Sequence, residues 1–140
     1  MKKSEYIFNN NAFINEGFST GTITKAAMYF TKEYIYIIPD LSQHVLGNEE
    51  YTTTEYTNSE SFLLDLESKI DTISSNDFHK MMKSFLPENL VNGIVSLDKF
   101  TISTGWLTAG IKLKTKGGKL KTISLKPRAQ LSELKAFYNL

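Results

Sequence analysis

A five-residue stretch, Tyr34-Ile-Tyr-Ile-Ile38, constrains the fold more than any other part of the sequence. Its β-branched and aromatic residues are typical of a β-strand. Side chains alternate along a strand, so Ile35 and Ile37 lie on one face, and the two tyrosines and the last isoleucine lie on the other. Because both faces are apolar, we expect other parts of the chain to cover this strand on both sides.

The middle of the chain supplies the expected cover, because its apolar residues follow a helical period. The motif Thr57-x-x-Glu60 has the spacing of a helix capping box. The apolar residues after it are Phe62, Leu63, Leu66, Ile70 and Ile73. A second helix is expected to begin at Ser74 or Ser75 and to stop at Pro87. Its apolar stripe comprises Phe78, Met81, Met82, Phe85 and Leu86.

Strands are predicted on both sides of this two-helix insert. Residues 22–30 precede it, and one extended run over residues 94–102 follows it. A lysine-rich hairpin over residues 110–126 comes next. A helix over residues 128–138 closes the chain, with the apolar stripe Leu131, Leu134, Phe137 and Tyr138. The sequence predicts one domain over residues 1–140, of the α+β class and mainly β, with a helical insert at about residues 59–87.

Three stretches resemble the pleckstrin-homology (PH) superfamily, including its GRAM-type and bacterial PH-like domains. GTITKAAMYFTKEYIYII (residues 21–38) is similar to an early strand pair of that superfamily. IKLKTKGGKLKTISL (residues 111–125) is similar to its late hairpin, and the last ten or so residues are similar to its closing helix. The resemblance implies a partly open barrel of two antiparallel sheets, plugged at one end by the C-terminal helix.

The same resemblance implies a binding function, since members mostly bind phosphoinositides, peptides or other proteins, and few are enzymes. Two features of the sequence depart from the family pattern. Many members have a tryptophan in the closing helix where this chain has Phe137. Members that bind phosphoinositides carry basic residues around the first hairpin, whereas residues 15–24 contain none and Lys25 is the first.

The net charge of +1 conceals a strong segregation of charge along the sequence. Residues 40–98 carry three Lys and eleven acidic residues, a net charge of −8. Residues 99–140 carry nine Lys and Arg and one Glu, a net charge of +8. Such segregation either attracts anionic partners or lets one part of the domain dock on another.

The composition is that of a soluble globular protein, and a cytoplasmic location is expected. Hydrophobic residues make up 41% of the chain and charged residues 22%. The chain contains no cysteine, which excludes disulfides and thiolate metal sites. No apolar run of roughly 18 residues, the length of a transmembrane segment, is present, and the first residues lack the apolar run of a secretory signal.

The hairpin lysines are the first candidate binding residues. A two-residue turn at Gly117-Gly118 is expected to place Lys116 opposite Lys119 and Lys114 opposite Lys121. Lys112 shares their outer face, and a bulge near residues 121–122 would return Ile123 and Leu125 to the core. The lysines either bind an anionic partner or protect a sheet edge from aggregation.

Trp106 is the sixth candidate residue. If the strand extends backward from Ile111, Leu107 and Ala109 point inward, and Trp106 shares the outer face with Lys112. A tryptophan beside lysines suits a protein hot spot, a membrane interface or a nucleic-acid base. The alternative is that Gly105 bends the chain and Trp106 folds onto the core. A nucleic-acid partner is not expected, because the chain has a single arginine, Arg128.

Little in the sequence indicates catalysis. His44 and His79 are far apart in sequence and lack metal-ligand spacing, and no nucleophile elbow or P-loop is present. We therefore expect no enzyme activity, no metal and no cofactor. One alternative is a small enzyme or ligand-binding protein with a pocket between the sheet and the insert. Its polar lining would come from Tyr36, His44, Tyr51 or Tyr56.

The sequence thus favours a non-enzymatic, PH-like binding module. The expected role is protein–protein interaction or self-association, and an anionic ligand or lipid membrane is a further partner considered for the hairpin. A third alternative is a structural subunit whose helical insert packs against another chain.

Overall fold

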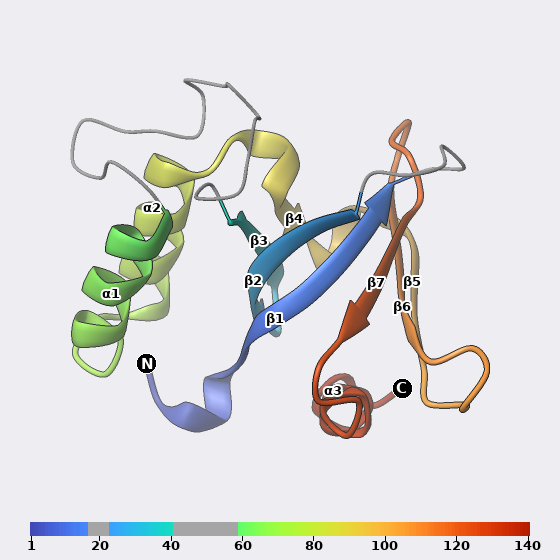
Figure 1. The fold of residues 1–140 in the computed structure, drawn as a ribbon. Helices are drawn as coiled ribbons and strands as arrows, with labels where there is room; N and C mark the ends of the chain where they lie inside the picture. Colours follow the sequence, from blue (N-terminus) through green and yellow to red (C-terminus); the bar gives the residue numbers. More distant parts are fainter. Residues whose placement is uncertain (17–22, 41–58) are drawn as a thin grey trace.

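The computed structural model describes residues 1–16, 23–40 and 59–140, and these ranges form an α+β domain that is mainly β (Figure 1). The strands are β1 (Tyr6–Glu16), β2 (Ile23–Thr31), β3 (Tyr34–Pro39), β4 (Val91–Gly93), β5 (Leu97–Ser103), β6 (Gly110–Thr115) and β7 (Lys121–Leu125). The α-helices of the described ranges are α1 (Ser59–Lys69), α2 (Ser75–Phe85) and α3 (Gln130–Tyr138). Short 3-10 helices are η1 (Lys3–Glu5), η4 (Glu88–Leu90) and η5 (Ile94–Ser96). The strand considered over residues 51–56 lies outside the described residues.

The strands form one bent antiparallel sheet in the order β4-β3-β2-β1-β7-β6-β5. β1 pairs with β2 on one side and with β7 on the other, so the sheet is continuous where two separate sheets were expected. The edge strands β4 and β5 are joined through η5 and are not paired with each other. The result is a nearly closed, barrel-like sheet.

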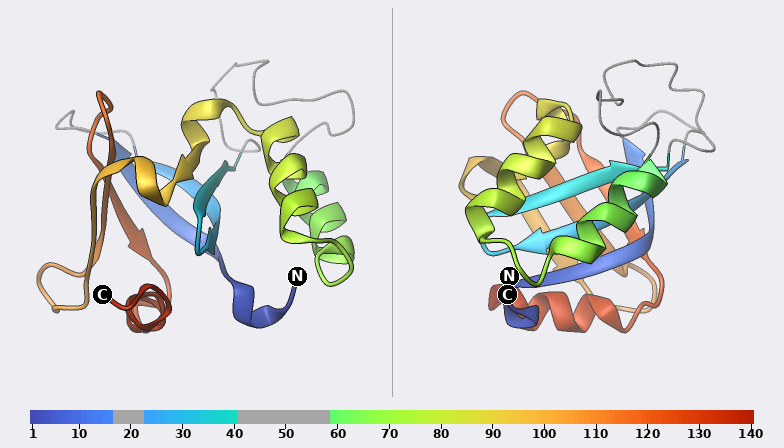
Figure 2. Two further views of the ribbon diagram at one scale, coloured as in Figure 1. Left: turned by 180° about the vertical axis from the view of Figure 1, so that it is seen from behind. Right: turned by 90° about the vertical axis from the view of Figure 1, so that its left-hand side faces the viewer.

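The helical insert covers β3, as the sequence predicts. Figure 2 shows α1 and α2 lying over the outer side of the early strands. Phe78 of α2 meets the rings of Tyr29 and Tyr36 edge-on, each at 5.3 Å between ring centroids. Ile35, Tyr36, Ile37 and Ile38 are all at most 2% exposed, so β3 is buried on both faces. Ser74 caps α2, because its hydroxyl accepts a hydrogen bond from the Asp77 N–H.

The C-terminal helix α3 closes one end of the barrel. Leu131 and Leu134 are buried on its inner side, which confirms the predicted stripe in part. Several hydrogen bonds tie the helix to the sheet, among them one from the Asn9 side-chain amide to the Gln130 side-chain oxygen. The Tyr138 hydroxyl donates to the Thr31 carbonyl at 2.7 Å, and the Gln130 amide donates to the Phe8 carbonyl at 3.0 Å.

The extended run predicted over residues 94–102 is wrong in its first part. The chain leaves β4 at Gly93, makes the 3-10 turn of η5, and enters β5 only at Leu97. Val95 is 97% exposed on that turn rather than part of a strand. The turn is needed because the chain passes there from one edge of the sheet to the other. None of the helices in the described ranges has the length and apolar character needed to cross a lipid bilayer.

Candidate functional site

The late hairpin turns differently from the predicted two-residue turn. Its turn runs from Thr115 to Gly118, closed by the Gly118 N–H donating to the Thr115 carbonyl at 3.0 Å. Gly117 lies at the third position with φ +72, a conformation that glycine adopts without strain. The ladder between β6 and β7 ends where Leu113 pairs with Lys121, so seven residues separate the paired positions. The predicted pairs Lys114–Lys121 and Lys116–Lys119 are therefore wrong.

This register moves Lys121 from the outer face to the inner one. In β7, Lys121, Ile123 and Leu125 alternate with exposed residues and are buried without the predicted bulge. Lys121 is 8% exposed, and its ammonium makes no ion pair with another described residue. Lys121 thus lies on the inner face of β7 and not on the outer face where it was predicted.

The lysines that do share an exposed face are Lys99, Lys112 and Lys114, and we call this surface the basic face. Lys114 of β6 pairs directly with Lys99 of β5. Lys112 pairs with Thr101 on one side and Thr122 on the other. Like charges directly opposite on a sheet destabilise it by roughly 0.2–1 kcal/mol. Lys99 was missed from the sequence because only the three-dimensional register brings it beside Lys114.

The charges of the basic face are not neutralised within the part of the chain that the structure describes. The ion pair that forms among the described residues joins Lys69 to Asp65 inside α1, far from the basic face, with 3.0 Å between the nitrogen and the oxygen. In the described residues, the acidic middle of the sequence therefore makes no ion pair with the basic C-terminal third.

Trp106 lies in the loop between β5 and β6, and the prediction that this segment continues β6 is wrong. β6 begins at Gly110, and Trp106 and Leu107 belong to a turn, 80% and 77% exposed. Trp106 does not fold onto the core, and Leu107 does not point inward. The Arg128 guanidinium donates to the Gly105 carbonyl at 3.0 Å, and the Ser103 and Thr108 hydroxyls lie 3.1 Å apart across the loop. The loop therefore presents two large apolar side chains from an anchored base.

The Trp106 loop and the hairpin tip lie at opposite ends of β6 (Figure 1). Lys116 and Lys119, both exposed, are at the tip, whereas Lys112 is two residues from the loop end of the strand. The two ends of β6, Gly110 and Thr115, are five residues apart, and five residues of a strand span roughly 17 Å. The structure thus divides the predicted site: Lys112 lies near the loop end of β6, Lys114 lies near its hairpin end, Lys116 and Lys119 are at the tip, and Lys121 is buried.

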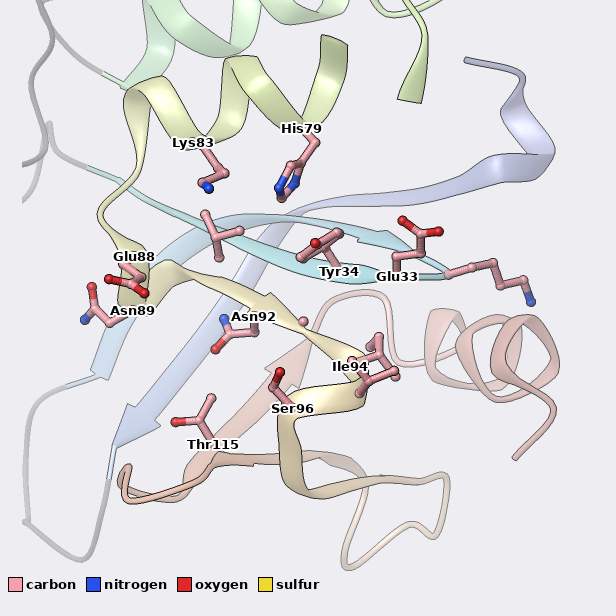
Figure 3. Close-up of a pocket in the computed structure, with 14 residues that line it drawn as sticks. Glu33, Tyr34, His79, Lys83, Glu88, Asn89, Asn92, Ile94, Ser96 and Thr115 are labelled. Atoms are coloured by element: carbon pink, nitrogen blue, oxygen red, sulfur yellow. The ribbon is translucent and has the colours of Figure 1, made fainter. Parts of the chain in front are cut away.

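A second candidate site is a groove of about 980 Å³ between α2, the β2–β3 turn, β4 and η5 (Figure 3). Its titratable lining includes Glu33, Tyr34, His79, Lys83 and Glu88. A smaller cavity of about 260 Å³ adjoins it beyond Tyr34 and His79. Of the residues predicted for a pocket beneath the insert, Tyr36 lines this cavity, whereas His44, Tyr51 and Tyr56 lie outside the described residues.

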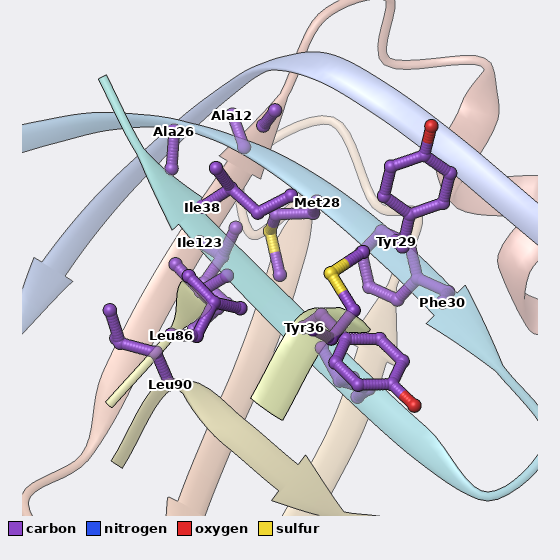
Figure 4. Packing of buried hydrophobic residues seen from close by; sticks show 14 of the residues in the cluster. Ala12, Ala26, Met28, Tyr29, Phe30, Tyr36, Ile38, Leu86, Leu90 and Ile123 are labelled. Atoms are coloured by element: carbon purple, nitrogen blue, oxygen red, sulfur yellow. The ribbon is translucent and has the colours of Figure 1, made fainter. Parts of the chain in front are cut away.

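His79 is the organising side chain of that groove. Its ring packs against the Tyr34 ring at 4.1 Å between centroids, and its Nδ1 lies 2.8 Å from the Tyr36 hydroxyl. The Tyr36 ring is buried among core residues, with its hydroxyl at the edge of the cluster (Figure 4). Burial raises the pKa of Tyr36, so its hydroxyl keeps its proton, and the hydroxyl and the imidazole share one hydrogen bond.

The pKa of His79 is lowered, chiefly by burial and next by the Lys83 ammonium, with an opposing effect from Glu33. The imidazole is therefore mainly neutral at pH 7. Among the described residues its hydrogen-bond partner is the Tyr36 hydroxyl, and none of them supplies the carboxylate that orients a catalytic histidine in a triad. In the described ranges, no group of three or more His, Cys, Asp or Glu side chains is arranged to hold a metal ion.

Comparison with protein-family models, curated proteins and solved structures finds no match to this chain.

Proposed function

We propose that the chain is a non-enzymatic binding module of the PH-like type that binds an acidic protein surface. Two features of the fold support the PH-like assignment. The strands follow the order β4-β3-β2-β1-β7-β6-β5, with β1 shared between the two halves of the sheet. The closing helix α3 plugs one end of the barrel and leaves the outer side of β5–β7 uncovered by a helix (Figure 2).

The observation that carries the proposal is the combination of three lysines, which make no ion pair with a described residue, with an apolar loop at the end of the same two strands. Lys99, Lys112 and Lys114 form the basic face, and Trp106 and Leu107 project from the loop that joins β5 and β6. Protein interfaces are commonly centred on a tryptophan or tyrosine and surrounded by polar residues. Exposed apolar side chains that lie together and are bordered by polar residues often mark a protein interaction site.

A protein partner fits this surface better than a membrane or a nucleic acid. Recognition of anionic lipid typically uses clusters of four to eight Lys and Arg, and the basic face has three lysines. Single-stranded nucleic acid is bound by several aromatic side chains, whereas Trp106 is the chain's one tryptophan. The other residues in register with Lys112 are the neutral hydroxyls Thr101 and Thr122, which suit hydrogen bonding to another protein.

The proposal is tested by fluorescence anisotropy with a labelled peptide rich in Glu and Leu. Lys112→Glu/Lys114→Glu should weaken binding about tenfold, because each exposed ion pair contributes roughly 0.2–1 kcal/mol and reversal adds repulsion. Lys116→Glu/Lys119→Glu is the matched control, with the same charge change on the same hairpin but far from Trp106. It should weaken binding less.

Two outcomes would contradict the proposal. Equal effects of the two double variants would mean that the peptide responds to overall charge and not to the basic face. Binding to phosphatidylserine-containing vesicles, but not to the peptide, would make a membrane the partner.

The groove beneath α2 supports a second candidate function, a small-ligand site or a small enzyme. The observation in its favour is that Lys83 and Glu88 line it together with His79 and form no ion pair with a described residue. Ligand-observed NMR with a fragment library would test it. Hits that persist unchanged in Tyr34→Ala and His79→Ala would place binding elsewhere.

A further inference from the structure

We infer that the acidic partner of the basic face is a second copy of this chain, bound through the outer side of α1. The inference rests on the proposed function, since it uses the basic face and the Trp106 loop as the binding surface. It adds the identity of the partner and the position of the complementary surface.

The complementary surface is a stripe of four exposed residues, Glu60, Leu64, Glu67 and Asp71, which we call the acidic stripe. Their spacings of four, three and four residues place them on one side of α1 and its continuing turn. The inner side of the helix is occupied by Phe62 and Leu66, both fully buried. Leu64 is 62% exposed between acidic neighbours.

The acidic stripe is not neutralised by the described part of its own chain. The ion pair of α1 uses Asp65 and Lys69, which are not members of the stripe. The stripe therefore carries three carboxylates around one apolar residue. The basic face carries three ammonium groups beside two apolar residues, so the two surfaces are complementary in both charge and apolar character.

A groove beside the stripe provides a place for an aromatic anchor. It measures about 300 Å³ and lies between α1 and the early strands. Phe8, Ala27, Ile38, Leu63 and Leu64 give it an apolar lining, and Glu60 and Glu67 also border it. An indole ring is of a suitable size, and a tryptophan in such a groove is the usual centre of a protein interface. We assign Trp106 of one copy to this groove of the next.

The two surfaces lie on opposite sides of the molecule, with α1 on one side of the sheet and β5 and β6 on the other (Figure 1, Figure 2). A contact between different surfaces of identical chains is head-to-tail, and it continues into chains or rings. The net charge of +1 means that copies do not strongly repel one another. Association should therefore continue past a dimer as concentration rises, and salt should weaken it.

Sedimentation velocity of the wild-type chain in low salt tests this inference, with two capping variants. The first, Trp106→Ala/Lys112→Ala/Lys114→Ala, loses the basic face and keeps the stripe. The second, Glu60→Ala/Leu64→Ala/Glu67→Ala, loses the stripe and keeps the basic face. Each variant alone should be monomeric, and an equimolar mixture should form a dimer that does not grow. These side chains are exposed except Lys114, which is half-buried, so the variants should keep the wild-type circular dichroism spectrum.

Lys116→Ala/Lys119→Ala is the matched control and should associate like the wild type. A wild-type chain that stays monomeric at every concentration in low salt would overturn the inference, as would association of the wild type with no dimer in the mixture. If the chain is monomeric but still binds the Glu- and Leu-rich peptide through Lys112 and Lys114, only the second-copy inference fails. If both fail, the basic face is not a protein-binding surface.

Discussion

Removing one hydroxyl group from Tyr36 should measurably loosen the attachment of α2 to the sheet. Tyr36 is 1% exposed, and its hydroxyl joins β3 to His79 of α2 by a 2.8 Å hydrogen bond. Tyr36→Phe keeps the ring and its edge-on contact with Phe78, so it creates no large cavity. The change isolates the hydrogen bond.

The magnitude follows from the surroundings of the two partners. A neutral hydrogen bond contributes about 0.5–1.5 kcal/mol to folding, and a fully buried partner left without a bond costs more. His79 is only half-buried, so water can reach its Nδ1 in the variant. We therefore expect Tyr36→Phe to lower the free energy of unfolding by about 1 kcal/mol.

Urea unfolding followed by far-ultraviolet circular dichroism is the appropriate assay, because exposed Trp106 reports poorly on the core. A double-mutant cycle with His79→Phe should give a coupling energy of about 1 kcal/mol. Tyr34→Phe is the control: its ring stacks on His79, but its hydroxyl bonds to no described residue. A coupling energy near zero, or an equal loss in Tyr34→Phe, would refute the role assigned to the Tyr36 hydroxyl.

Four further predictions concern stability. Phe78→Ala should cost about 3–5 kcal/mol in urea unfolding, because it empties a fully buried ring site, and a loss below 1 kcal/mol would contradict that packing. Gly110→Ala should destabilise by more than about 1 kcal/mol, since φ is +150 and a Cβ would lie 2.8 Å from the Ile123 carbonyl oxygen; unchanged stability would exclude this close approach. Lys121→Met should stabilise by roughly 1 kcal/mol by removing a buried charge, and a loss would indicate a partner for the ammonium. Because the pKa of His79 in the folded protein lies below its ordinary 6.5, its contribution to the free energy of unfolding is complete above pH 6.5 and is lost as the pH falls further. His79→Phe should therefore make the free energy of unfolding depend less steeply on pH below 6.5. An equally steep dependence in the variant would point to other groups.

The elements that the sequence predicted well are those with a strong local pattern. The apolar period of residues 62–86 identified the two insert helices, and Ser74 marked the start of the second one. The stretch Tyr34–Ile38 predicted both a strand and its burial on two faces, because no alternation with polar residues was present. These predictions depend on residues close in sequence, where the pattern itself carries the information.

The candidate site was predicted less well, because it depends on register. A strand that shifts by one residue presents its other face, so a wrong turn length at residues 114–120 moved Lys121 to the wrong side of the sheet. The same uncertainty concealed the Lys99–Lys114 pair, whose members are on different strands. A turn with one glycine at φ +72 and a turn centred on Gly-Gly have nearly the same sequence signature.

Trp106 and His79 show two other limits of sequence reasoning. The sequence prediction placed Leu107 in the core on the assumption that strand alternation continues through residues 106–109. The strand β6 begins only at Gly110, so alternation does not apply to Leu107. The bond between Tyr36 and His79 joins residues 43 positions apart on a strand and a helix. No spacing rule connects such residues, and only the docking of α2 on β3 brings them together.

The most direct test of the central claim, that the basic face and the Trp106 loop bind an acidic protein surface, is the fluorescence of the chain's single tryptophan. Trp106 emission should shift to shorter wavelength when the Glu- and Leu-rich peptide is added in low salt, because the partner removes an 80% exposed indole from water. The shift should reverse at high salt and be reduced in Lys112→Glu/Lys114→Glu. Saturating peptide binding with an unchanged emission spectrum would contradict the account.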